Sequence, residues 1–323
     1  MFEVSDQLLR RLLQINSFPT PTRDQPLFFF GFRGCLPDRA DPAPQAFARS
    51  HRLVQAELDY VHPRCTLVEW QPWGDGEHSV AVFPGSTVPN LACIAKARAK
   101  GGAGANQLMT GYFSDYAKGI HHPNDAERAT KAFVQTMPRT VRRTQDDLDY
   151  DTLDEARIEL PHDNLHAAWC ETVEGTYDSF SSAGCQVVVG YPECRMHAAG
   201  DTGPWRVFKE NAYGRYPDQQ KFPYVLLNAT EAANVNLGVP ATPRLRFGSA
   251  GPLVTALQRA LDVHHLYPGR IDGQFGERTF LGVLAFQAAK LGAQADDGIV
   301  GPRTAAALGV DWPSLPSELR PNV

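Results

Sequence analysis

The 323-residue chain lacks the sequence features of several common protein classes. It has no apolar run of about 18 residues, so no membrane span is expected. Its formal net charge is −5 and it has no long basic run, which excludes the electrostatic pattern of a nucleic-acid-binding protein. Its six cysteines form no C-x-x-C pair and do not cluster with histidine at zinc-finger spacing, so no metal site and no cofactor are expected.

The N-terminal segment "MFEVSDQLLRRLLQINSF" also lacks the basic region and apolar core of a secretory signal. Leu8, Leu9, Leu12 and Leu13 instead follow helical spacing, which predicts a packed amphipathic helix. Without a signal peptide, reduced thiols are the starting expectation for the cysteines.

The clearest pattern that the chain does contain is a repeat near its C-terminal end. "DGQFGERT" at 272–279 is similar to "DGIVGPRT" at 297–304. Each Asp-Gly pair suits a tight turn in which the glycine takes a positive φ, and a helix can start after the second glycine of each copy. With the apolar periodicity around the two copies, this predicts three short helices over 247–310.

The first 230 residues have a different pattern, in which short apolar runs alternate with stretches rich in turn residues. Strands are predicted at 27–32, 66–70, 78–83, 91–96, 107–113, 164–169, 186–190 and 222–227. Helices are predicted at 45–58, 125–137 and 205–213. The fold class predicted is therefore α+β, with a β-rich N-terminal domain and a small three-helix C-terminal domain. The predicted division is 1–232 for the β-rich domain, 233–246 for a linker, 247–310 for the helical domain and 311–323 for a tail.

The predicted helical domain resembles the small peptidoglycan-binding domain found on many cell-wall enzymes. The segments that carry the resemblance are "LVTALQRAL", "GRIDGQFGERTFLGVLAFQ" and "DGIVGPRT". The resemblance implies non-covalent binding of peptidoglycan. The alternative is a generic helical appendage or a dimerisation module.

Cys185 stands in the segment "SSAGCQVVVG", between small residues and a valine-rich strand. His166 lies 19 residues earlier in another strand-like run, so two neighbouring strands could present both side chains. A nearby histidine can take the proton of a thiol nucleophile, and backbone N–H groups at Gly184 and Cys185 could form an oxyanion site. The alternatives are a buried structural cysteine and a structural histidine.

This segment is similar to the active-site motif of L,D-transpeptidases of the YkuD type, over a core of about 90–230. The matching residues are His166, Ser182, Gly184 and Cys185. The departures are Ala167 for a glycine, Ala183 for the motif histidine and Val187 for an arginine. The resemblance implies that the cysteine attacks the carbonyl of the third stem-peptide residue of peptidoglycan, and that the acyl group then passes to an amine or to water.

Substrate contacts are harder to assign because the motif arginine is absent. Arg195 and Arg206 are candidates to replace it, and Tyr112 is a candidate cleft residue in "GYFSDYAKGIHH". The same segment brings His121 and His122, which as adjacent histidines do not define a metal site. Asp163 is an alternative partner that could orient His166.

The sequence therefore predicts a cysteine enzyme that acts on peptidoglycan stem peptides by acyl-enzyme chemistry, L,D-transpeptidase-like, with Cys185 as nucleophile and His166 as base. Hydrolysis and exchange both remain open. Synthesis in the cytoplasm without a signal peptide predicts non-classical delivery to the wall or periplasm, as a phage lysis enzyme or an antibacterial effector, with delivery machinery or an immunity protein as further partners. The alternative is a non-catalytic peptidoglycan-binding protein with a decayed catalytic fold.

Overall fold

The computed structural model describes residues 1–102, 104–144, 150–174, 180–239, 241–292 and 295–315. The last eight residues of the tail predicted over 311–323 lie outside the described residues. Among the helices within these ranges, none combines the length and the apolar character needed to cross a bilayer.

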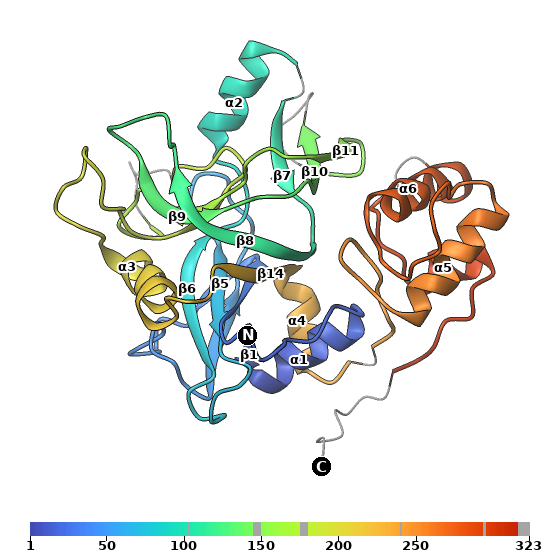
Figure 1. Cartoon of the computed structure of the whole chain (residues 1–323), viewed down its shortest axis with the longest axis horizontal. Coiled ribbons are helices and arrows are strands. Elements are labelled where there is room, and N and C mark those ends of the chain that lie inside the picture. The colour runs from blue at the N-terminus through green and yellow to red at the C-terminus, as the bar shows by residue number, and fades with distance from the viewer. Residues whose placement is uncertain (103, 145–149, 175–179, 240, 293–294, 316–323) are drawn as a thin grey trace.

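Eight strands in the described part of the N-terminal region close into a barrel (Figure 1). In order around the barrel they are β12 (Leu165–Ala167), β13 (Gln186–Val188), β6 (Val80–Ser86), β5 (Cys65–Trp70), β2 (Phe28–Arg33), β14 (Lys221–Asn228), β8 (Gly111–His121) and β9 (Thr130–Val134). Neighbouring strands run antiparallel except for β12 with β13 and β14 with β2, which run parallel. The structure is thus α+β with a β-rich N-terminal region, as predicted.

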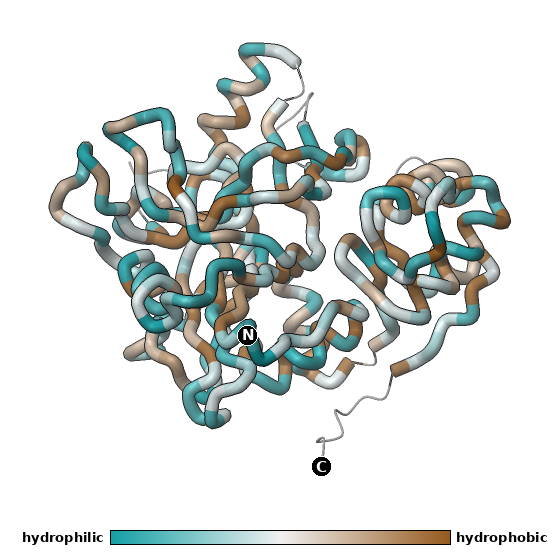
Figure 2. The backbone as a smooth tube through the Cα atoms, viewed as in Figure 1, coloured by the Kyte–Doolittle hydropathy of each residue, from teal (hydrophilic) through white to brown (hydrophobic). Residues whose placement is uncertain are grey.

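Strand β2 shows why the barrel is stable, because apolar residues cover both of its faces. Phe28 and Phe30 belong to one buried cluster, together with apolar residues of helix α1 (Asp6–Ile15) and helix α4 (Ala229–Asn236). Phe29 belongs to the other cluster, where it stacks on Phe222. This period of two is that of a strand buried on both sides. Figure 2 shows hydrophobic segments running through the barrel and hydrophilic ones on outer loops.

Within the described part of the N-terminal region, two smaller sheets and two further helices flank the barrel. One sheet has the order β1 (Phe2–Ser5), β4 (Ser50–Gln55), β3 (Cys35–Pro37), and the other has the order β11 (Glu155–Glu159), β10 (Arg139–Thr144), β7 (Ala105–Leu108). Helix α2 spans Leu91–Lys100, and helix α3 (Gly203–Glu210) continues into a π-helical turn at Asn211–Arg215. Trp205 and Phe208 of α3 pack against the second cluster.

Three of the local predictions in this region are wrong. The segment 91–96 is part of helix α2, whose first turn is capped by the Asn90 side chain accepting from the Ala92 N–H. The segments predicted as helices at 45–58 and 125–137 instead contain β4 and β9. Each gains its partner from elsewhere in the chain: β4 pairs with β1, and β9 pairs with β8 and β12. Such pairing overrides local helical periodicity.

The C-terminal domain contains, within its described residues, the three predicted helices: α5 (Pro252–Val263), α6 (Glu277–Leu291) and α7 (Pro302–Leu308). The repeat has a structural explanation. Buried Gln258 of α5 accepts from the N–H groups of Asp272 and Gly273, and buried Gln287 of α6 accepts from the N–H of Gly298. Each Asp-Gly turn is therefore held by a glutamine from the preceding helix.

The C-terminal domain is joined to the barrel region by polar and apolar contacts. Arg246, which is 1% exposed, donates to Thr110 Oγ1 and to Glu231 Oε1 at 2.8 and 2.6 Å. Arg142 of β10 donates to the carbonyl of Asp296 at 3.1 Å. Leu245, in the segment predicted as a linker, is fully buried and pairs with Val300.

Candidate active site

Parallel pairing of β12 with β13 brings Cys185 and His166 together. The register places His166 opposite Val187, and Cys185 immediately precedes β13. Both residues are buried, with His166 2% and Cys185 8% exposed. A ring nitrogen of His166, a ring nitrogen of His121 and the Cys185 Sγ all lie within 4.8 Å of one another. The thiol and an imidazole are therefore close enough for proton transfer after a small adjustment.

The turn before Cys185 is held by hydrogen bonds of the Ser182 side chain and contains a glycine with a positive φ. Ser182 Oγ donates to the carbonyl of Cys185 at 2.8 Å and accepts from the N–H of Gly184 at 3.2 Å. Gly184 has a φ of +136°, which is unfavourable for residues with a Cβ. In this resting geometry the Gly184 N–H, a candidate oxyanion donor, is engaged by Ser182.

Buried polar side chains contact the turn that contains Gly184 and fix its position. Gln186 Nε2 donates to the carbonyl of Gly184, and its Oε1 accepts from the Tyr224 hydroxyl at 3.0 Å. Asn106 Nδ2 donates to Asp163 Oδ2 at 2.5 Å. Burial raises the pKa of Asp163 to about 7, and the hydrogen bond from Asn106 opposes that rise. These contacts do not support the hypothesis that Asp163 orients His166, because the Asp163 carboxylate accepts from Asn106.

His166 is oriented by a backbone carbonyl. Its Nδ1 lies 2.7 Å from the carbonyl oxygen of Ala167, which can only accept a hydrogen bond. Nδ1 therefore carries the proton, and in the neutral ring Nε2 has the free lone pair. Burial lowers the pKa of His166 to about 4. His166 is thus neutral near pH 7 and has a nitrogen that can accept a proton.

Cys185 rests as a neutral thiol. Burial, followed by the nearby Asp163 carboxylate, raises the pKa of Cys185 well above its ordinary value. Its S–H donates to the carbonyl of His162, with the sulfur 3.7 Å from that oxygen. A preformed thiolate–imidazolium pair is therefore disfavoured, and loss of the thiol proton would have to accompany attack on a substrate.

The cluster of Cys185, His166 and His121 has the side-chain types of a soft-metal site. The Nδ1 atoms of His166 and His121 are hydrogen-bonded to Ala167 and Asn164. Each ring would therefore have to offer Nε2 to an ion. Among the residues that the structure describes, these three side chains could hold zinc, and the thiolate form of Cys185 would be required.

The predicted substrate residues lie at three different places. Arg195 forms an exposed ion pair with Glu127 at 3.2 Å, beside the loop that follows His121. Arg206 is exposed on α3. Tyr112 lies at the opposite end of β8 from His121, about 30 Å along the strand, where its ring contacts Phe18. The structure thus does not bring Tyr112 to the cysteine.

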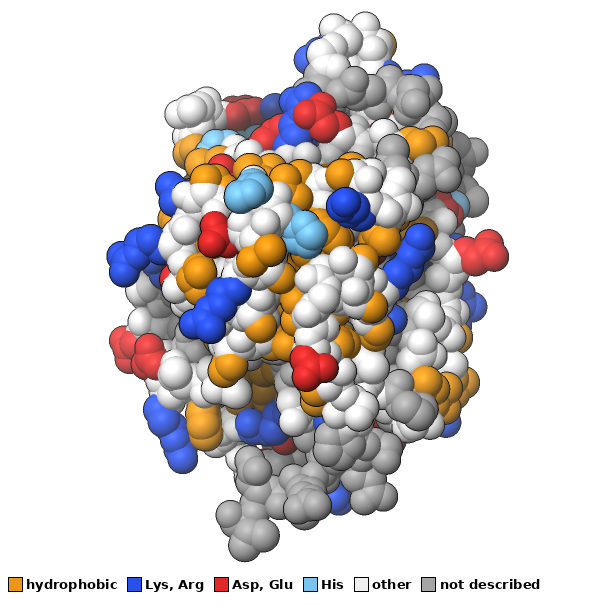
Figure 3. Space-filling model, turned by 90° about the vertical axis from the view of Figure 1, so that its right-hand side faces the viewer, with side chains coloured by type: hydrophobic (Ala, Val, Ile, Leu, Met, Phe, Trp, Pro, Cys, Tyr) orange, Lys and Arg blue, Asp and Glu red, His pale blue; other side chains and the backbone are white. Residues whose placement is uncertain are grey.

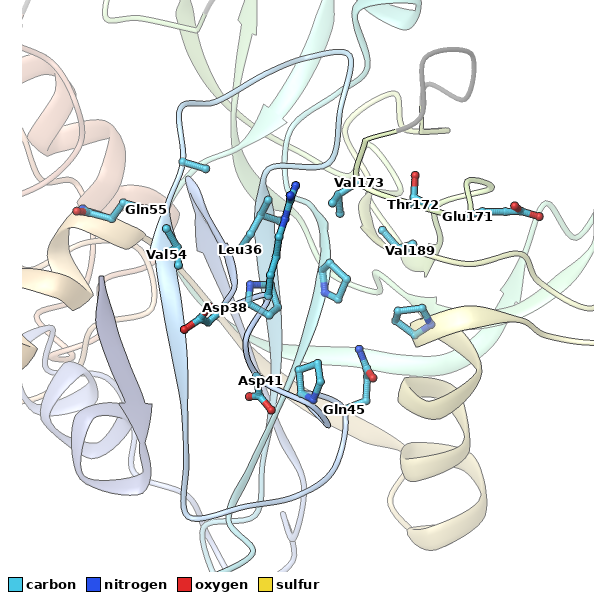
Figure 4. A pocket seen from close by; sticks show the side chains of 16 residues that line it. Leu36, Asp38, Asp41, Gln45, Val54, Gln55, Glu171, Thr172, Val173 and Val189 are labelled. Carbon is cyan, nitrogen blue, oxygen red and sulfur yellow. The ribbon is translucent and has the colours of Figure 1, made fainter.

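A cavity of about 520 Å³ opens between strands β3 and β4 and the segment after β12 (Figure 4). Val189 lines it and shares a buried cluster with Cys185. Cys185 and Val189 flank strand β13 and lie on the same face of it, about 13 Å apart along the chain direction. The wall is largely apolar, and Asp38, Asp41 and Glu171 contribute to its lining.

Comparison with known proteins identifies the C-terminal domain. Residues 250–308 match the family described as "Putative peptidoglycan binding domain". The chain carries a peptidoglycan-binding domain. This supports association with the cell wall, with peptidoglycan as a partner. No curated protein and no solved structure matches the chain. The peptidoglycan-binding domain is thus the part with a family assignment, and the barrel has none from these comparisons.

Sequence reasoning did not place His121, Asn164 and Asn106 at the site. Asn164 lies two residues before His166, and its amide contacts His121 at 2.9 Å. The available signal was the pair of histidines in "GIHH" and the polar "HDN" before the strand that contains His166. Neither signal states which strands become neighbours.

Proposed function

We propose that the chain is a cysteine enzyme that acts on peptidoglycan stem peptides through an acyl-enzyme, in the manner of L,D-transpeptidases. One observation carries the proposal: a glycine turn holds the Cys185 thiol within 4.8 Å of a ring nitrogen of His166, and Nε2 of that ring has a lone pair free for a proton. The peptidoglycan-binding domain on the same chain supports the choice of substrate.

The chemical steps follow from these positions. Cys185 Sγ attacks the carbonyl carbon of the third stem residue, while the thiol proton moves to His166 Nε2. Collapse of the tetrahedral adduct breaks the amide bond, and His166 returns the proton to the leaving amine. An amine or a water molecule then attacks the thioester carbon and gives a proton to His166. The C–S bond breaks, and the Cys185 sulfur takes that proton back, which completes exchange or hydrolysis.

A second candidate, a non-catalytic wall-binding protein, is favoured by the resting geometry of the thiol. Burial raises the pKa of Cys185, and its proton is directed to His162 rather than to His166. A Cys185 that is alkylated no faster than a free model thiol at neutral pH, with no muropeptide turnover, would favour this candidate.

The second part of the proposal is that the peptidoglycan-binding domain holds the protein on the cell wall. Figure 3, in which the side of the molecule bearing the C-terminal domain faces the viewer, shows hydrophobic side chains interspersed with Lys, Arg and His. Val263 and Leu281 of the peptidoglycan-binding domain are 76% and 47% exposed. A domain anchored to the wall raises the local concentration of stem peptides around the barrel. Delivery by a phage or by a secretion machine, and an immunity protein as partner, belong to the same proposal.

The pH profile tests the role of His166. Because the pKa of His166 is lowered to about 4, the neutral base is present above that pH. We expect the acid limb of kcat/KM for a soluble muropeptide to fall near pH 4, rather than near the ordinary histidine value of about 6.5. Thermal melts at each pH distinguish protonation of His166 from unfolding of the protein in acid. An acid limb near pH 6.5 with the protein still folded would contradict the assignment.

A glutamine variant tests the wall-binding domain within the full chain. Gln258→Leu leaves the N–H groups of Asp272 and Gly273, the second of them buried, without their acceptor, at a cost of about 2–4 kcal/mol. We expect reduced co-sedimentation with purified sacculi and unchanged turnover of soluble muropeptides. Gln274→Leu, at an exposed position on the same turn, is the matched control. Equal sedimentation of both variants and wild type would count against retention through this domain.

A further inference from the structure

His121 is a second buried imidazole beside the thiol, and the chemical steps above do not use it. It ends strand β8 and is 8% exposed. Its ring stacks on that of His166, with centroids 4.0 Å apart and an angle of 15° between the planes. Its cluster with Cys185 and His166 places one of its nitrogens within 4.8 Å of Sγ.

The hydrogen bonds around Asn164 determine which nitrogen of His121 carries the proton. Asn164 Oδ1 accepts from the backbone N–H of Gln135 at 3.0 Å, so the oxygen of the amide is assigned. Asn164 Nδ2 is therefore the atom that faces His121 Nδ1 at 2.9 Å, and it can only donate. Nδ1 of His121 must accept, which places the ring proton on Nε2.

The two stacked rings therefore have opposite tautomers. His166 is protonated on Nδ1 and has a free lone pair on Nε2, whereas His121 has its N–H at Nε2. Burial, followed by the neighbouring His166 and His122, lowers the pKa of His121 to about 2, so this ring is neutral. One ring is suited to take a proton and the other to donate a hydrogen bond.

We propose that His121 donates its Nε2–H to the negative charge that develops at Cys185 when His166 takes the thiol proton. This inference rests on the proposed role of Cys185 as nucleophile. It supplies a donor that the turn lacks in its resting state, because Ser182 engages the Gly184 N–H and Ala183 has no polar side chain. A preorganised neutral donor in a buried site stabilises a developing anion strongly.

Four further titratable or charged groups act on His121 or on Cys185. His122 and Arg128, in the β8–β9 connection, act on His121, whereas Asp163, before β12, and Cys93, on α2, act on Cys185. His122 and Arg128 disfavour protonation of His121, and Asp163 disfavours the thiolate. A neutral donor close to sulfur would oppose the effects of burial and of Asp163 on the thiol.

Alkylation of Cys185 in the full chain tests the inference without any substrate. Iodoacetamide is added over a range of pH, and modification of the Cys185 peptide is followed by mass spectrometry for wild type, His121→Asn and His121→Gln. Asn places an amide near Nδ1 and removes the Nε2 donor, whereas Gln places an amide near Nε2. We expect His121→Asn to slow alkylation at pH 7 about tenfold, which is a rise of about one unit in the thiol pKa, and His121→Gln to recover most of the rate.

The outcomes separate this inference from the proposed function. Equal rates for the three proteins, or equal loss in both variants, would overturn the donor role of His121. Stoichiometric Zn²⁺ binding by wild type that both variants abolish would also overturn it, because His121 would then be a ligand through Nε2. Absent muropeptide turnover with the expected alkylation pattern would instead remove the enzyme proposal and leave the donor role intact. Thermal melts confirm that each variant is folded.

Discussion

Replacement of Cys185 by alanine is expected to lower muropeptide turnover about 10³-fold or more. The reason is that no other group would form the thioester, and removal of a nucleophile costs most of the catalytic rate. The change removes one atom from a side chain that is 8% exposed, so we expect a stability loss of only about 1 kcal/mol. Product analysis by mass spectrometry, with D-alanine release as the readout, checks the prediction.

Two further measurements sharpen this test. Cys93→Ala is the matched control, because Cys93 lies on α2 near the site but is only partly buried; its turnover is expected to match wild type. Rapid quenching of wild type with a stem tetrapeptide is expected to give a covalent adduct that Cys185→Ala lacks. Full activity in Cys185→Ala would eliminate the nucleophile assignment, and loss of that activity in chelator would then point to a metal-dependent hydrolase whose site does not use Cys185.

The barrel strands were largely predictable because their apolar runs are short and bounded by turn residues. The run at 27–32 corresponds to β2, in which all six residues are buried, and 205–213 corresponds to α3 with its π-helical continuation. Two of the three errors arose where strand pairing overrides a helical pattern in the local sequence. Segment 45–58 has apolar residues at helical spacing, but Leu53 is buried through pairing of β4 with β1.

The candidate site was predictable only in part for a related reason. Cys185 and His166 belong to a motif with short spacing, so a resemblance could suggest both. His121 lies 45 residues before His166, on a strand separated from β12 by β9 in the sheet order. The Asn164–Gln135 hydrogen bond that sets its tautomer depends on side-chain orientation, which residue spacing does not encode. The pKa shifts of Asp163, His166 and Cys185 likewise arise from their burial in the folded protein, which the local sequence does not determine.

Replacement of Gly184 by alanine is expected to disrupt both stability and activity. A Cβ at this position would lie 2.6 Å from Asp163 Oδ1 and 2.8 Å from the carbonyl oxygen of Asn106, and it would also meet Asn106 Nδ2. Together with the φ of +136°, we expect a loss of about 2–5 kcal/mol in the free energy of unfolding. Urea denaturation measures this loss.

Gly200→Ala provides the comparison that isolates the contact. Gly200 has a φ of +92°, and a Cβ there would meet nothing within 4 Å, so its cost of about 1–2 kcal/mol reflects backbone strain alone. An equal loss in the two variants would mean that the Asn106–Asp163 pair tolerates the extra atom. A larger loss in Gly184→Ala, with turnover reduced beyond the unfolded fraction, would mean that the close approach of this turn to the pair sets the position of the Cys185 sulfur.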